Sequence, residues 1–286
     1  MKHFDDIKDN EIRIINCQET EQRPAYRRRW LWVVLAAVLL ILAIVLVFWL
    51  SRPENGSDAP AIDTKSPVAV APTIVKSEPA EVLVRDTIIN DVPLSLFTPV
   101  NAMPKLSLGI PDTTDQSLIL ALQAADIRAD NNKIVGAFVL QGELLARGVA
   151  KKGFCAILDG KIQLGMAEST PLFEETTAKN GYFFRQYPLV NKGVLVENNP
   201  KNKAIRHALC ELDGQIVVVS STSRESFHDF AQALVDLGVV NAIALTGGDA
   251  FGFRHDSKNG LLTWGSDLKK SKNIPGLNFI VWRSAK

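Results

Sequence analysis

The apolar positions of this chain form one long uninterrupted run and, further along, a series of short ones. The long run, residues 30–50, contains no charged residue, no Gly and no Pro. A helix rises about 1.5 Å per residue, so this run would extend about 30 Å, the thickness of a bilayer hydrocarbon core. Trp30 and Trp49 lie at its ends, where aromatic side chains favour a membrane surface. We expect a transmembrane helix in contact with lipid, in preference to a buried core helix or a cleaved signal peptide.

The charges on either side of this segment predict its orientation. Arg23, Arg27, Arg28 and Arg29 precede it, whereas one cation, Arg52, and then Glu54 and Asp58 follow it. Because the cationic flank of a membrane helix stays in the cytoplasm, residues 1–29 are expected to form a basic cytoplasmic tail. The chain is thus predicted to be a single-pass, signal-anchored protein of the cell (inner or plasma) membrane, with an extracytoplasmic C-terminal domain.

The segment after the long run has no apolar periodicity. Residues 51–80 are rich in Pro, Ala and Ser, a composition typical of an extended tether that cannot build a core. The pattern changes at residue 81, and residues 81–286 have a length that suits one globular domain.

Short apolar runs in this domain predict alternating strands and helices. Strands are expected at 81–89, 133–140 and 241–245. Two hairpins are expected around Asp159-Gly160 and Asp213-Gly214, since this dipeptide suits a tight turn with positive φ. Capping boxes beginning at Thr113 and Thr222 predict helices over about 113–125 and 225–237, the second ending at Gly238. The expected class is α+β: a mixed, largely antiparallel sheet with packed helices.

Composition and charge exclude several kinds of function. The net charge is +1, so nothing indicates a nucleic-acid partner. The three cysteines form no metal-binding spacing, and neither a metal site nor a cofactor is expected. Cys155 and Cys210 are equally consistent with two buried free thiols and with a disulfide. The oligomeric state is not predicted.

Two local features carry potential chemistry. The strand at 241–245 runs directly into Thr246-Gly247-Gly248, where a bare backbone would let a ligand approach closely, although a simple tight turn has the same pattern. Arg206 lies in an apolar strand, where it would either form a buried salt bridge or bind a phosphate or carboxylate through its planar guanidinium. His207 would point to the opposite face and is expected to be structural.

Several motifs together resemble a known family. They are V-G-A-F at 135–138, Y-P-L-V-x-x-G at 187–193, I-R-H-A-L at 205–209 and the block 227–248 ending in T-G-G. This set resembles the phosphodiester glycosidase family over about residues 133–255. The resemblance implies a mixed α+β fold and a hydrolase that removes a sugar joined through a phosphodiester, as in N-acetylglucosamine-1-phosphodiesters. The substrate of such a hydrolase would be a glycan that contains sugar-phosphodiester linkages, either in the cell envelope or secreted.

The resemblance also implies a site, with two departures. The family usually has Asn before the glycine at 136 and Asp before the pair Gly247 and Gly248, where this chain has Val135 and Thr246. The implied substrate-binding residues, listed together, are Gly136, Arg206, Thr246, Gly247 and Gly248. Asp249 or Glu143 is expected to supply the catalytic carboxylate. The departures leave two alternatives open: a catalytically inactive module that binds carbohydrate or phosphate, and a structural envelope protein.

Overall fold

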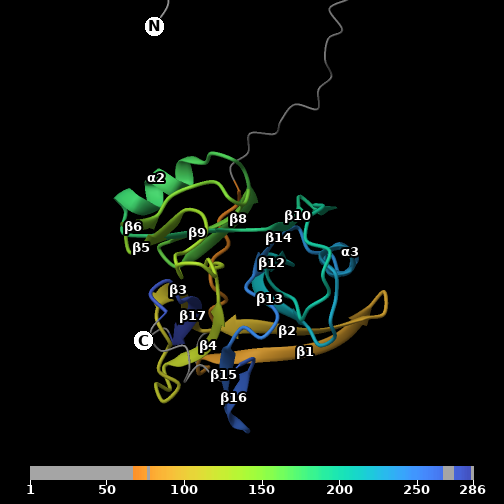
Figure 1. Ribbon diagram of the computed structural model, residues 1–286. Coiled ribbons are helices and arrows are strands. Elements are labelled where there is room, and N and C mark those ends of the chain that lie inside the picture. Colours follow the sequence, from red (N-terminus) through yellow and green to blue (C-terminus); the bar gives the residue numbers. More distant parts are fainter. Residues whose placement is uncertain (1–66, 76–77, 267–273, 285–286) are drawn as a thin grey trace, which may run out of the picture. The chain divides into compact units, whose positions relative to one another are not determined.

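In the computed structural model, residues 67–75, 78–266 and 274–284 are described, and they belong to one compact unit, Lys65–Lys286. These residues hold 17 strands and two helices. The fold is therefore mostly β-sheet, and the expected α+β class with packed helices is wrong. Most of the short apolar runs pair with one another as strands within three sheets, so few of them form helices (Figure 1).

All three sheets are antiparallel wherever strands pair. The seven-stranded sheet has the order β1 (Glu81–Ile89), β2 (Val92–Val100), β13 (Gln215–Ser221), β12 (His207–Leu212), β14 (Asn241–Leu245), β10 (Pro188–Asn191) and β11 (Val194–Leu195). One five-stranded sheet, which we call the C-terminal sheet, has the order β16 (Gly260–Trp264), β15 (Gly252–Asp256), β4 (Leu118–Gln123), β17 (Asn278–Ser284) and β3 (Ala102–Leu108). The other, the middle sheet, has the order β6 (Glu143–Ala146), β5 (Phe138–Leu140), β9 (Tyr182–Gln186), β7 (Gly153–Leu158) and β8 (Lys161–Met166).

The main hydrophobic core lies where the three sheets face one another. Leu209 and Ile243 enter it from the seven-stranded sheet, Leu120 from the C-terminal sheet, and Phe138 and Phe184 from the middle sheet. All of these side chains are almost completely buried. Burial of large apolar side chains is the dominant stabilising contribution, so this shared core fixes how the sheet ends meet.

The two helices cover outer faces of the sheets. Helix α2 (Pro171–Ala178) packs on the middle sheet, over Phe154 and Phe183 (Figure 1). Helix α3 (Phe227–Asp236) packs on the seven-stranded sheet, with Phe230 and Leu234 fully buried. Each helix therefore closes a second, smaller core on the face opposite the main core.

Several local predictions are confirmed. The Asp159-Gly160 and Asp213-Gly214 turns have positive φ at both residues and join β7 to β8 and β12 to β13. Helix α3 forms within the predicted range, and Gly238 follows it with a φ of +96°. The cap is Ser226, whose hydroxyl accepts a hydrogen bond from the N–H of Asp229, so the predicted capping box at Thr222 is wrong.

Other predictions need correction. The predicted helix at 113–125 is wrong, because this segment contains β4, whose residues from Leu118 to Leu122 are all buried. The predicted strand at 133–140 is shortened to β5, although Ile134 forms an isolated bridge with Ile127. Cys155 and Cys210 lie in different sheets as buried free thiols, which excludes the disulfide between them.

The predicted membrane association is also corrected. In the part of the chain that the structure describes, no helix has the length and apolar character needed to cross a membrane. The single-pass, signal-anchored topology and the membrane localisation are therefore not upheld. The predicted span at 30–50 and the predicted tail at 1–29 lie outside the described residues.

Part of the segment predicted as a tether lies against the domain. Val70 is buried in the main core and exchanges two backbone hydrogen bonds with Ile162 of β8. Thr73 accepts a hydrogen bond from the N–H of Asn101, whose side chain in turn accepts one from the N–H of Val75. These contacts attach residues 67–75 to both the middle sheet and the turn between β2 and β3.

Candidate functional site

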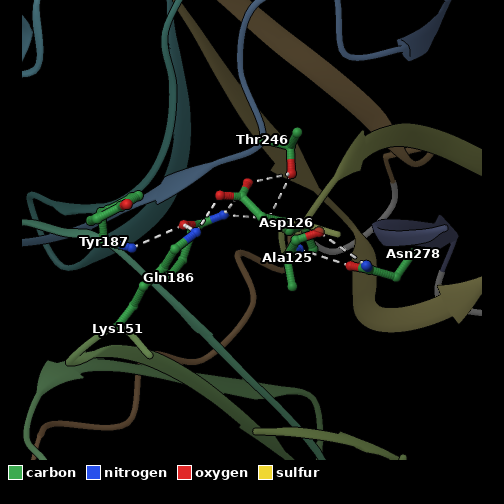
Figure 2. Close-up of polar contacts among 8 residues, drawn as sticks. Ala125, Asp126, Lys151, Gln186, Tyr187, Thr246 and Asn278 are labelled. Carbon is green, nitrogen blue, oxygen red and sulfur yellow. Dashed lines mark hydrogen bonds and ion pairs between the residues drawn. The ribbon is translucent and has the colours of Figure 1, made fainter. Parts of the chain in front are cut away.

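Four polar side chains converge where strands of the three sheets end (Figure 2). Asp126 follows β4, Lys151 precedes β7, Gln186 ends β9 and Thr246 directly follows β14. We call these four residues the Asp126 network. It joins all three sheets at one point, so residues far apart in the sequence become direct neighbours.

The carboxylate of Asp126 accepts hydrogen bonds from the other three members of this network. Lys151 forms an ion pair with its Oδ2. The Nε2 of Gln186 donates to its Oδ1 at 2.8 Å. The hydroxyl of Thr246 lies 3.3 Å from this oxygen and 3.3 Å from the carbonyl oxygen of Ala124, so the two acceptors share its one proton. Gln186 also accepts a hydrogen bond from Lys151 at 2.6 Å through its Oε1, which ties the cation and the amide together. The carboxylate is thus held in one orientation.

The backbone that carries Asp126 is fixed by Asn278 of β17. The side chain of Asn278 accepts a hydrogen bond from the N–H of Ala125 at 2.8 Å and donates one to the carbonyl of Ala125 at 3.0 Å (Figure 2). The carbonyl of Asp126 accepts a hydrogen bond from the N–H of Val135 at 2.8 Å. Because Asn278 is buried, these bonds are protected from water, and the position of Asp126 is well defined.

The two charges of the ion pair differ in their access to solvent. The side chain of Lys151 is 5% exposed, whereas that of Asp126 is 36% exposed. Burial lowers the pKa of Lys151, and the nearby carboxylate of Asp126 partly opposes that shift. The ammonium group also lies 4.3 Å from the centre of the Tyr187 ring, which favours a cation. Lys151 therefore serves to hold Asp126, whose carboxylate is the more exposed of the two charges.

This asymmetry predicts unequal effects of removing each partner. Asp126→Asn leaves a buried ammonium without its counter-charge and is expected to lower the free energy of unfolding by about 2 kcal/mol, less than for a fully buried pair because water reaches Asp126. Lys151→Met leaves a carboxylate that water can solvate and is expected to cost only about 1 kcal/mol. Denaturant unfolding of both variants and of the double variant measures this. Equal costs for the two single variants would contradict the asymmetry.

The Thr246-Gly247-Gly248 turn is fitted closely against the neighbouring chain. The N–H of Thr246 donates to the carbonyl of Gln123 at 3.2 Å, and the N–H of Gly248 donates to the carbonyl of Ile205 at 2.8 Å. A Cβ at position 247 would lie 2.6 Å from that Ile205 oxygen, so only glycine fits there. Gly248 has a φ of +68°, which also favours glycine. The turn therefore places the Thr246 hydroxyl beside Asp126.

Arg206 adjoins this turn through its main chain, while its guanidinium lies on the α3 side of the sheet. Its Cα is 3.8 Å from where a Cβ of Gly247 would be. Its Nε donates to the carbonyl of Glu225 at 2.9 Å, and its Nη2 donates to the carbonyl of Asn202. The guanidinium lies 4.0 Å from the centre of the Phe227 ring, and burial lowers its pKa.

Neither of the two predicted catalytic carboxylates belongs to the Asp126 network. Asp249 is exposed in the loop between β14 and β15, and its carbonyl accepts a hydrogen bond from the N–H of Ser266. Glu143 is exposed at the start of β6. Within the described residues, no hydrogen bond or ion pair connects either carboxylate to the network. Their catalytic role stays a prediction.

Gly136 lines a cavity of about 740 Å³ together with Val135, Lys133 and Arg147. The cavity adjoins the Asp126 network through Val135, whose N–H donates to the carbonyl of Asp126, but none of the four side chains of the network lines it. A Cβ at position 136 would lie 3.2 Å from the Cβ of Arg185, and φ there is +84°. Glycine is thus favoured at position 136 because φ is positive there and because a Cβ would crowd the side chain of Arg185.

Sequence reasoning missed three members of the network: Asp126, Lys151 and Gln186. Each is a polar residue at or near the end of an apolar strand, and that is the signal that could have found them. No group of three or more His, Cys, Asp or Glu side chains in the described ranges is arranged to hold a metal ion.

Comparisons with known proteins give a fold and no sequence family. No protein-family model matches the chain, and no curated protein is similar to it in sequence. Among solved structures, the catalytic domain of zebrafish N-acetylglucosamine-1-phosphodiester alpha-N-acetylglucosaminidase, auto-inhibited by its pro-peptide, aligns with a TM-score of 0.54 and 12% identity over 77% of this chain and 89% of that chain. A hypothetical protein from Synechocystis aligns with a TM-score of 0.44 and 15% identity, over 73% of this chain and 64% of that chain. The family resemblance seen in the sequence is thus supported as a distant fold relationship, and the chain has a phosphodiester glycosidase-like fold.

Proposed function

We propose that this domain is a hydrolase that cleaves a sugar from a phosphodiester, and that Asp126 is its catalytic carboxylate. One observation carries this proposal. The sequence resemblance expects an acid at position 246, and the Oδ1 of Asp126 lies 3.3 Å from the Thr246 hydroxyl that stands there. A carboxylate from the segment after β4 therefore lies beside the position where the turn lacks an acid.

The proposed reaction needs little more than this carboxylate. Water attacks the anomeric carbon, the bond from that carbon to the phosphate oxygen breaks, and its electron pair leaves with the phosphate monoester. Positive charge develops on the sugar carbon in the transition state, and an ordered carboxylate beside it is stabilising. The water's proton passes to solvent or to Asp126. A phosphate is a weakly basic leaving group, so it needs less help from a general acid than an alcohol does.

The cavity beside the network suits such a substrate in size and charge. Its volume of about 740 Å³ lies in the range typical of small-molecule sites. Lys133 and Arg147 line it, and neither forms an ion pair within the described residues. Their charges complement a phosphate, and the bare backbone at Gly136 lets a ligand approach the wall closely.

The remaining predicted residues keep supporting roles in this proposal. Thr246 orients Asp126, Gly247 and Gly248 shape the turn beside it, and Gly136 belongs to the cavity wall. For Arg206 we propose a structural role beside the turn, because its Nε and Nη2 donate to the carbonyl groups of Glu225 and Asn202 and its main chain adjoins Gly247. Asp249 and Glu143 provide matched control positions for Asp126.

A second function has an observation of its own in its favour. Val135 and Thr246 replace the polar residues that the family usually has, and Lys151 already neutralises Asp126. Both features suit a module that binds carbohydrate or phosphate and does not hydrolyse it. Such a module would bind a sugar phosphodiester stably and release no product.

One experiment separates the two functions. The full chain is incubated with an N-acetylglucosamine-1-phosphodiester, and both binding and release of N-acetylglucosamine are followed. The hydrolase proposal expects catalytic release that depends on Asp126. Binding without release would replace it with the binding module, and absence of both would contradict the two functions together.

A further inference from the structure

A second hollow adjoins the cavity described above. It has a volume of about 310 Å³ and is lined by Ser169, Thr170, Phe173 and Glu174 around the start of α2, with Arg185 on its inner wall. Arg147 and Gly148 line both this hollow and the larger cavity. The two hollows therefore meet at one short stretch of chain.

The stretch between the hollows carries few side chains. Gly148 has a φ of +118°, and a Cβ built on it would have open space around it. Its carbonyl accepts a hydrogen bond from the N–H of Ala137 at 2.9 Å, which holds this stretch beside Gly136. Arg147 is exposed and forms no ion pair or hydrogen bond within the described residues. A long ligand could thus cross from one hollow to the other past a single free guanidinium.

The smaller hollow has the chemistry of a sugar subsite. Phe173, which also packs against Phe183, contributes apolar surface. Ser169 and Glu174 offer hydroxyl and carboxylate oxygens, and the Thr170 hydroxyl, which caps α2 by accepting from the N–H of Leu172, can still donate. Glu168 also lines the hollow, but it is paired with Lys152. Arg185 is 3% exposed; its Nη atoms donate to carbonyls of the surrounding loops, and its Nε is buried without a partner. Burial lowers the pKa of this arginine, and within the described residues no carboxylate is paired with it.

We propose that the two hollows form one groove for a chain of at least two sugar units joined by phosphodiesters, with Arg147 contacting the phosphate between them. One sugar unit lies in the smaller hollow against Phe173, and the next lies in the cavity beside Gly136. This inference rests on the proposed function, because it names the substrate class of the same site. It adds that the substrate is an oligomer and that specificity depends on a residue outside the Asp126 network.

The test is a binding series on the full chain. The probes are N-acetylglucosamine 1-phosphate, a synthetic dimer and trimer of N-acetylglucosamine joined by 1-phosphodiesters, and neutral chitotriose. We expect affinity to rise about tenfold or more from monomer to dimer, since one added charge-assisted contact contributes on that order. Arg147→Gln is expected to remove most of this gain and to leave the affinity for chitotriose unchanged.

Arg224→Gln is the matched control, because Arg224 is also an exposed arginine but lines neither hollow. This variant is expected to bind the dimer as the unaltered chain does. Equal affinity for monomer, dimer and trimer would overturn the groove, and so would an equal loss for monomer and dimer in Arg147→Gln. Binding that depends on length without any hydrolysis would keep the groove and reject only the proposed enzyme.

Discussion

Asp126→Asn is expected to lower kcat/KM for an N-acetylglucosamine-1-phosphodiester by about 10² to 10⁴, the usual contribution of one positioned carboxylate. Asparagine keeps the shape of the side chain but loses the charge that would face the developing positive sugar carbon. The Thr246 hydroxyl, which donates to Asp126 at 3.3 Å, would still be in place. The fall should therefore appear mainly in kcat, as for a group whose interaction strengthens in the transition state.

Two controls separate this effect from loss of folding or from a different catalytic group. Asp249→Asn and Glu143→Gln change exposed carboxylates outside the network and are expected to lower kcat/KM by less than about threefold. The double variant Asp126→Asn with Lys151→Met removes the unpaired buried ammonium and should be more stable than Asp126→Asn alone. If stability returns while activity does not, the carboxylate itself is required. A larger loss in Asp249→Asn or Glu143→Gln than in Asp126→Asn would assign catalysis to that residue instead.

Because of the lowered pKa of His207, the free energy of unfolding is expected to decrease by about 3 kcal/mol when the pH falls from about 6.5 to about 4. Its side chain is buried in β12, its Nδ1 lies 2.7 Å from the Ser220 hydroxyl, and its Nε2 is buried without a partner. Burial lowers its pKa from 6.5 to about 4. Between these values the unfolded chain binds a proton that the folded chain does not, so the free energy of unfolding decreases as the solution becomes more acidic.

The measurement is the free energy of unfolding against pH for the unaltered chain and for His207→Asn. Asparagine cannot take up a proton, so the variant should have a flatter profile between pH 6.5 and pH 4 even if it is less stable throughout. Hydrogen bonds lower the pKa values of Asp115 and Asp256 to about 2. These carboxylates therefore change the free energy of unfolding only below about pH 4, outside the range from pH 6.5 to pH 4. Parallel profiles for the two proteins would show that His207 does not carry the pH dependence.

The parts of the fold that could be predicted from the sequence are those that local chemistry decides. Asp159-Gly160 and Asp213-Gly214 form their turns because the required positive φ is available to these residues wherever the strands go. Helix α3 was predictable from its one-sided apolar pattern and from Gly238. The segment 118–123 was mistaken for a helix because a short run that is buried on both faces has no periodicity to distinguish the two structures. Its pairing with β15 and β17 decided the outcome.

The candidate site was predictable only in part, for a different reason. The glycines of the turn after β14 stand out in the sequence because a strand that ends in Gly-Gly is unusual. The partners of Thr246 do not stand out, because Asp126 lies 120 residues away in the chain and Lys151 is separated from Asp126 by 25. Such contacts depend on the way the three sheets pack. A polar residue at a strand end marks each partner as a candidate, but no local pattern tells which strand ends meet, and only the folded structure brings them together.

The place of Asp126 in the reaction is tested most directly by a crystal structure of the chain with a phosphonate analogue of an N-acetylglucosamine-1-phosphodiester, which cannot be hydrolysed. We expect the sugar ring to bind beside the Thr246-Gly247-Gly248 turn, with its anomeric carbon within about 3.5 Å of an Asp126 carboxylate oxygen. We expect the phosphonate to face Lys133, which lines the larger cavity and not the smaller hollow. An analogue bound with its anomeric carbon against Asp249 or Glu143, or bound away from the turn altogether, would contradict the assignment of Asp126.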